Sequence, residues 1–104
     1  MDGAQDLDLH LQLVNAEAKV QVCVRYAPDM ASAFTARMEK WRGVHSAALT
    51  RGAELAESRG FNKQPASIRQ LAEFQAKILE ALPEDDRSRR CEELLESFVV
   101  PAQK

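Results

Sequence analysis

The sequence predicts an α+β fold: a two-stranded antiparallel β-hairpin over residues 7–26, followed by three α-helices (ββααα). Two observations predict it. Residues 7–13 and 20–26 each alternate between apolar and polar side chains, which is the period of a strand with one buried face. Beyond Pro28 the apolar residues recur at helical spacing instead. The 104 residues suffice for one domain with a single core, so we expect residues 1–104 to form a single domain.

The register of the predicted hairpin follows from its apolar face. If the leucines of the first strand face the valines of the second, Leu9 lies opposite Val24, and a slip by one residue would expose the whole face. On the other face the same register sets His10 opposite Cys23. Two strands alone are not stable in water, so we expect the helices or a second subunit to cover the apolar face.

The first helix is expected over residues 30–58, with Asp29 as its N-cap. One apolar face contains Phe34, Met38, Trp41, His45, Ala48, Gly52 and Leu55. The small residues of this face would let another element approach closely. Because glycine weakens a helix, a break near Gly43 with Ser46 as a new cap is the alternative to the single, bent helix that we favour.

Two shorter helices are expected over residues 65–82 and 84–99. Gly60 suits the left-handed position beyond the end of the first helix, and Pro65 suits the first turn of the second. The apolar stripes of these helices are Ile68, Leu71, Phe74, Ile78 and Leu82 in one, and Cys91, Leu94, Leu95, Phe98 and Val99 in the other. We expect each helix to bury its stripe in the core.

The composition, with 45% hydrophobic and 29% charged residues, is typical of a soluble globular protein. No apolar run approaches the roughly 20 residues that span a bilayer, and the acidic start lacks the features of a secretory signal. We therefore expect a cytoplasmic protein without membrane contact. Cys23 and Cys91 lie far apart and form no CxxC motif, which favours reduced thiols over a disulfide.

The sequence contains no motif for catalysis, metal binding or phosphate binding, so we expect no enzyme, no cofactor and no metal site. His10 and Cys23 come nearest to a chemical site, because an imidazole beside a thiol could activate it or supply half a zinc site. A nucleophilic pair needs a third, orienting group, and zinc needs about four ligands. We interpret both residues as ordinary contacts of the sheet face.

A candidate interaction surface on the predicted first helix consists of Arg37, Lys40, Trp41, His45 and Arg51. Trp41 is interpreted as a core anchor and His45 as a residue at the core edge, with a ligand pocket between them as the alternative. The three basic residues share one flank and could contact phosphates. The pI near 5.7 and the acidic segments on either side argue against nucleic acid.

The function predicted is a small non-catalytic protein–protein interaction module, such as an adaptor, inhibitor or chaperone-like protein of bacterial type, acting as a homodimer. Free sheet edges, or the small-residue seam around Ala48 and Gly52, would make the dimer contact. One alternative is a nucleic-acid-associated regulator that uses the basic flank of the first helix. The second alternative is a small-ligand-binding protein or enzyme with a pocket near Trp41 and His45.

Overall fold

The computed structural model describes residues 3–61 and 67–98. Within these residues the chain forms α1 (Ala4–Tyr26), the short 3-10 helix η1 (Pro28–Met30), α2 (Ala31–Val44), α3 (Ser46–Ser58), α4 (Ile68–Glu80) and α5 (Glu84–Glu96). The described part contains no strand, so the predicted α+β class is wrong. The predicted hairpin, residues 7–26, lies entirely within α1.

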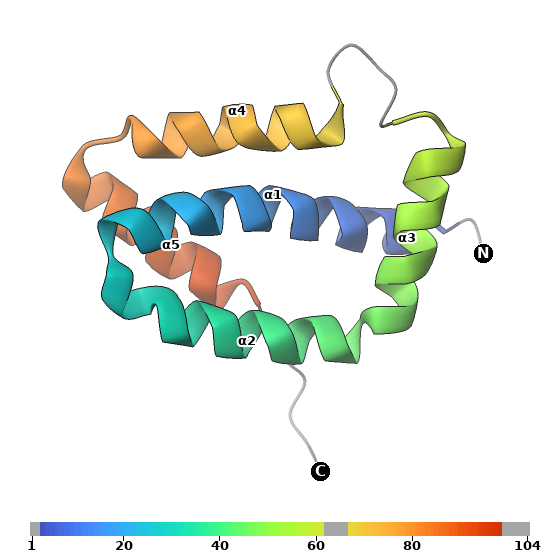
Figure 1. The fold of residues 1–104 in the computed structure, drawn as a ribbon, viewed down its shortest axis with the longest axis horizontal. Helices are drawn as coiled ribbons and strands as arrows, with labels where there is room; N and C mark the ends of the chain where they lie inside the picture. The colour runs from blue at the N-terminus through green and yellow to red at the C-terminus, as the bar shows by residue number, and fades with distance from the viewer. Residues whose placement is uncertain (1–2, 62–66, 99–104) are drawn as a thin grey trace.

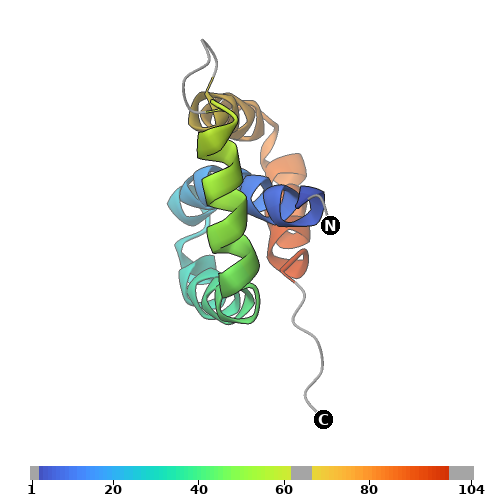
Figure 2. The same ribbon diagram turned by 90° about the vertical axis from the view of Figure 1, so that its right-hand side faces the viewer.

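The central element of the fold is α1, as Figure 1 shows. On one side α4 runs beside it in the same direction, and on the other side lies α2. Helix α3 crosses the N-terminal part of α1, and Figure 2 shows α5 behind the layer that α4, α1 and α2 form. All the other helices are thus arranged around α1.

The alternating pattern of residues 7–26 is explained by a helix that is buried on several sides. At 3.6 residues per turn, every second position spreads around the whole circumference of a helix. Helix α1 uses this spread, because Leu7 packs against α3 and α4, and Leu13 packs against Trp41 of α2. Near the end of α1, Val22 joins a third cluster with residues of α2, α4 and α5. The alternation therefore marks several buried faces of a helix, and not one face of a strand.

The predicted first helix, residues 30–58, is divided at His45, so the prediction of one continuous helix is wrong. The alternative break near Gly43 lies two residues from the observed one. Ser46 begins α3 but makes no side-chain capping hydrogen bond, and Asp29 lies within η1 instead of capping α2. In Figure 1 the division lets α3 turn away from α2 and cross α1.

The end of α3 confirms the prediction for Gly60, which has φ +75°. The N–H of Phe61 donates to the carbonyl of Ala56 at 2.9 Å, and the N–H of Gly60 donates to the carbonyl of Glu57 at 3.0 Å. These two bonds are those of a Schellman motif, which requires a left-handed residue at this position. A glycine adopts that conformation without steric penalty.

The two predicted C-terminal helices are present as α4 and α5. Both are shorter than their predicted ranges, 65–82 and 84–99. Helix α4 begins after Ser67, whose hydroxyl accepts from the N–H of Gln70 at 3.2 Å. The side chain of Gln70 in turn accepts from the N–H of Ser67 at 3.0 Å, which completes a capping box. The predicted positions 65 and 99 lie outside the described residues.

Cys23 and Cys91 form a disulfide that links the C-terminal part of α1 to α5, so the expectation of reduced thiols is wrong. Their Cα atoms are 5.7 Å apart, and the two residues are only 0% and 3% exposed. Disulfides are rare in the cytosol, and the cytoplasmic compartment stays a prediction. No helix in the described part of the chain is long and apolar enough to cross a membrane.

Removing this disulfide should destabilise the fold substantially. The bond closes a loop across a sequence separation of 68 residues, and the chain-entropy model assigns such a loop about 4 kcal/mol. We expect the Cys23→Ala/Cys91→Ala variant to lose about this much free energy of unfolding in urea titrations. Reductant should shift the wild type toward the variant and leave the variant unchanged. Equal midpoints for the wild type with and without reductant would contradict the assignment.

The crossing of α3 over α1 depends on Gly52. A Cβ atom placed there would overlap the backbone carbonyl of Asp6 and lie 2.9 Å from the Cβ of His10. The predicted close approach is thus confirmed at Gly52, and the approaching element is α1 of the same chain. Gly52 is therefore buried within the monomer, which overturns the predicted dimer contact through this residue.

Two glycine-to-alanine variants should change stability in opposite directions. At Gly52 the added methyl group must push α3 away from α1, so we expect a loss of about 1–3 kcal/mol. Gly43 lies in α2 with nothing within 4 Å of an added Cβ, so Gly43→Ala should gain about 0.5–1 kcal/mol from helix propensity. Urea unfolding of both variants checks the pair, and a Gly52→Ala variant as stable as the wild type would refute the close crossing.

Candidate interaction surface

Helix α4 buries Ile68, Ala72, Ala76 and Leu79 and leaves three other large apolar residues exposed. Ala72 and Ala76, where α4 lies along α1, are 1% and 7% exposed. Leu71, Phe74 and Ile78 are 53%, 60% and 47% exposed. The prediction that α4 buries the stripe containing these three residues is therefore wrong for its middle part. Alanines on the buried face let α4 pack closely against α1, and the larger apolar side chains lie about a quarter turn or more away.

We name Leu71, Phe74 and Ile78 the α4 seam. Their spacing of three and four residues places them in one line along the helix. Only two other large apolar side chains in the described residues, Tyr26 and Val44, are comparably exposed. Single exposed apolar residues are normal on a protein surface, but a continuous line of them is typical of a binding site.

A shallow groove of about 410 Å³ continues from the seam toward α5. Ile78 belongs to both, and the other apolar residues of the groove are Leu79, Leu82 and Leu94. Charged side chains, among them Lys19 and Arg90, also line it. The seam together with the groove makes one surface, partly apolar and partly charged, that runs from the middle of α4 to α5.

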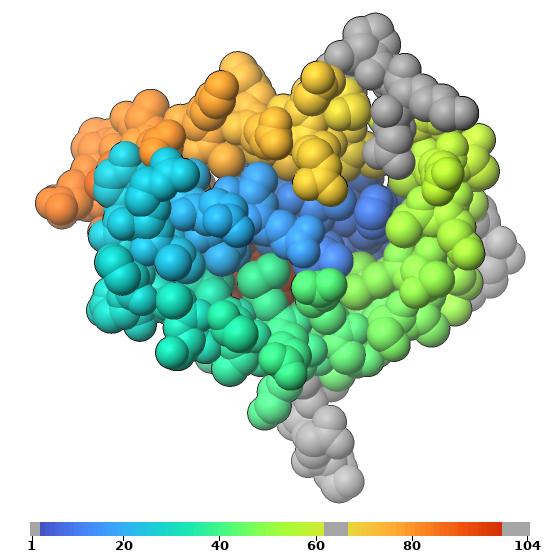
Figure 3. All heavy atoms as spheres, in the orientation of Figure 1, coloured from blue at the N-terminus to red at the C-terminus, as the bar shows by residue number. Residues whose placement is uncertain are grey.

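A second groove, of about 720 Å³, lies on the other side of α4, between that helix and α1. Figure 3 shows this face of the molecule, with α1 recessed between α4 and α2. Small apolar residues such as Ala18 and Ala72 line the groove, together with charged residues of both signs, including Glu17, Arg69 and Lys77. The mixed charge gives no preference for an anionic or a cationic ligand.

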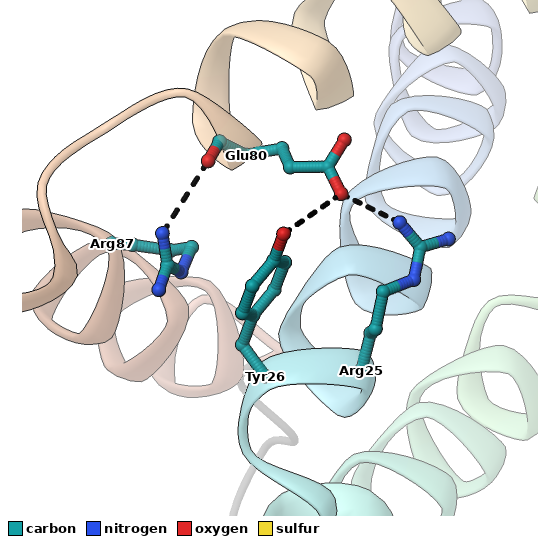
Figure 4. Close-up of polar contacts among 4 residues, drawn as sticks. All are labelled: Arg25, Tyr26, Glu80 and Arg87. Carbon is teal, nitrogen blue, oxygen red and sulfur yellow. Dashed lines mark hydrogen bonds and ion pairs between the residues drawn. The ribbon is translucent and has the colours of Figure 1, made fainter.

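The corner between α4 and α5 is fixed by four polar residues, shown in Figure 4. Glu80 accepts from the Arg25 guanidinium at 2.6 Å and from the Tyr26 hydroxyl at 3.2 Å. Arg87 lies over the Tyr26 ring, 3.9 Å from its centroid, and donates to the carbonyl of Leu82 at 3.0 Å. The cluster joins the end of α1 to α4 and α5, although exposed ion pairs of this kind contribute little to stability. No pattern in the sequence pairs residues so far apart.

The predicted neighbours His10 and Cys23 are not neighbours. Both lie in α1, 13 positions apart, which corresponds to about 20 Å along a helix. Cys23 is bonded to Cys91, and His10 lies at the crossing of α1 and α3 beside Gly52. The two residues therefore form no joint site.

The predicted basic flank is divided by the helix break. Arg37 and Lys40 belong to α2, whereas Arg51 belongs to α3. The Nε of Arg51 donates to the Asp6 carboxylate at 2.8 Å, so its charge is paired within the chain. The three predicted residues therefore do not share one flank of one helix.

Trp41 is a core residue, as interpreted from the sequence, and is 3% exposed. Its ring packs edge-on against Phe98, with centroids 5.3 Å apart, and lies 4.9 Å from the His45 ring. None of the grooves described above is lined by Trp41 or His45. In the described residues, no group of three or more His, Cys, Asp or Glu side chains is placed to hold a metal ion.

Comparisons with protein-family models, with curated proteins and with solved structures found no match to this chain.

The stability of the protein should fall in mild acid because of His10. Partial burial lowers the pKa of His10 below its ordinary value of 6.5, although the nearby Glu17 carboxylate opposes this shift. The unfolded chain then binds a proton that the folded chain rejects, so stability falls as the pH drops through 6.5 toward the lower folded pKa. Melting temperatures between pH 8 and pH 5 measure this effect.

The His10→Gln variant should lose this part of the pH dependence while behaving like the wild type at pH 8. Glu17→Gln should enlarge the acid-induced fall, because it removes the charge that raises the pKa of His10. Identical pH profiles for the wild type and His10→Gln would contradict the argument.

Proposed function

We propose that the protein is a small non-catalytic protein–protein interaction module and that the α4 seam is its contact surface. The observation that carries the proposal is that Leu71, Phe74 and Ile78 are about half exposed, although α4 has a separate, buried face against α1. Fully burying one such large side chain contributes about 1.5–3 kcal/mol. A partner that covers the seam would bury this remaining apolar surface, and the burial would favour binding.

The composition of the seam suits protein recognition. Its central residue, Phe74, is the most exposed of the large apolar residues, and aromatic side chains are enriched among those that dominate binding energy. Polar residues such as Gln70 and Gln75 flank it on the same helix. An apolar centre with a polar margin is the common anatomy of a protein interface.

The two alternative functions, small-ligand binding and nucleic-acid binding, have less support in the arrangement of their residues. A ligand pocket near Trp41 and His45 gains no support, because Trp41 is buried against Phe98 and His45 and neither Trp41 nor His45 lines a groove described above. A nucleic-acid surface on one helix lacks its third residue, because Arg51 lies on α3 and pairs with Asp6. A protein partner is therefore the proposal that the surface supports best.

Photocrosslinking from single positions tests this proposal. A photoreactive phenylalanine analogue at Phe74 should give adducts of defined mass when the protein is irradiated in its native host. The same group at Val44, which is 49% exposed near the end of α2, serves as the matched control and should give none. Equal labelling from both positions, or no adduct from position 74, would refute the α4 seam as the contact surface.

A further inference from the structure

We propose that the partner of the α4 seam is a second copy of this chain, bound by antiparallel contact of two α4 helices about a two-fold axis near Phe74. This inference rests on the proposed function of the seam. The symmetry places Phe74 of one copy against Phe74 of the other. It also places Leu71 of each copy against Ile78 of the other, because these two residues lie at nearly equal distances along the helix from the axis.

In this arrangement, apolar side chains of one copy meet apolar side chains of the other. At about 100° per residue, Leu71 and Ile78 lie about 60° and 40° to the same side of Phe74. In an antiparallel pair the same sides of the two helices meet. Each Leu71 would therefore pack on an Ile78, and the two aromatic rings would meet at the centre. The seam is thus complementary to itself, which a two-fold contact requires.

Charges on the other side of Phe74 are complementary in the same arrangement. Lys77 and Glu73 lie about 60° and 100° to that side, are exposed, and have opposite charge. Neither takes part in an ion pair within the described part of the monomer. The two-fold axis that opposes Leu71 to Ile78 also opposes Glu73 of each copy to Lys77 of the other. The same two-fold axis therefore gives favourable contacts on both the apolar and the charged side of α4.

The size of the seam sets the expected strength. Three half-exposed side chains and the margin of one 13-residue helix make a contact at the lower end of specific interfaces. We therefore expect a dimer that dissociates on dilution, with a dissociation constant on the order of 1–100 μM. Both predicted dimer geometries, through sheet edges and through Gly52, are replaced by this one.

A charge-reversal mixing experiment tests the arrangement. Sedimentation of the wild type over a micromolar concentration series should show mass rising from 11.6 kDa toward twice that value. Glu73→Lys alone and Lys77→Glu alone each place like charges opposite one another at both symmetric positions. Each should raise the dissociation constant at least tenfold. An equimolar mixture of the two variants should dimerise again, because every cross-copy pair is then attractive.

The mixture also controls for effects within one helix, because those effects are the same in the separate and the mixed samples. Phe74→Glu should be monomeric, whereas Val44→Glu, the matched exposed control, should dimerise like the wild type. Circular dichroism of each variant verifies that the helices are retained.

The outcomes separate the two proposals. A wild-type dimer whose charge-reversed variants do not recover on mixing would overturn the antiparallel arrangement. A wild type that is monomeric at all concentrations, yet crosslinks from position 74 to a different protein, would overturn the self-contact and leave the proposed function standing. A monomer without crosslinks from position 74 would overturn both.

Discussion

The structure depends on the burial of α1 on several sides at once. The other α-helices of the described part, α2 to α5, contain 13 or 14 residues each, and helices of that length are marginal on their own in water. Three clusters along α1 support them: Leu7 lies in a cluster with α3 and α4, Leu13 lies in one with α2, and Val22 lies in one with α2, α4 and α5. The 23 residues of α1 therefore act as the common core of the fold.

Close packing against α1 also decides which residues the surface presents. Gly52 lets α3 approach α1 closely, and Ala72 and Ala76 do the same for α4. The face of α4 that turns inward contains Ala72 and Ala76, so the three large side chains of the seam, a quarter turn or more away, stay outside the contact with α1. The exposed Phe74 is in this sense a consequence of the buried Ala72 and Ala76. The face of α4 that packs against α1 thus determines both how the helix docks and which of its residues form the contact surface.

Part of this architecture could be predicted from the sequence. Local signals indicate where helices begin and end. Examples are Gly60 after α3, Pro83 before α5 and the apolar spacing of the C-terminal helices. The hairpin prediction was wrong because alternation also occurs in a helix that is buried on several sides. The segment 15–18 held contrary information, since it contains alanine and glutamate, which favour helix, and no glycine for a tight turn.

The contact surface was less accessible to prediction from the sequence, because α4 has apolar residues on two faces. Periodicity identifies both faces but not the one that turns inward, and this choice depends on how near α1 lies. The Cys23–Cys91 bond and the contacts of Glu80 likewise join residues that only the tertiary fold brings together. Long-range pairing of this kind leaves no periodic trace in the chain.

The apolar surface on α4 has two parts that are held in place differently. Leu71 and Phe74 depend only on the packing of α4 along α1, which the capping box at Ser67 and the buried alanines secure. The groove beyond Ile78 also depends on α5, whose single buried helical residue, Cys91, is bonded to α1. The disulfide therefore governs the groove, whereas the self-complementary centre around Phe74 is set by α1 and α4 alone.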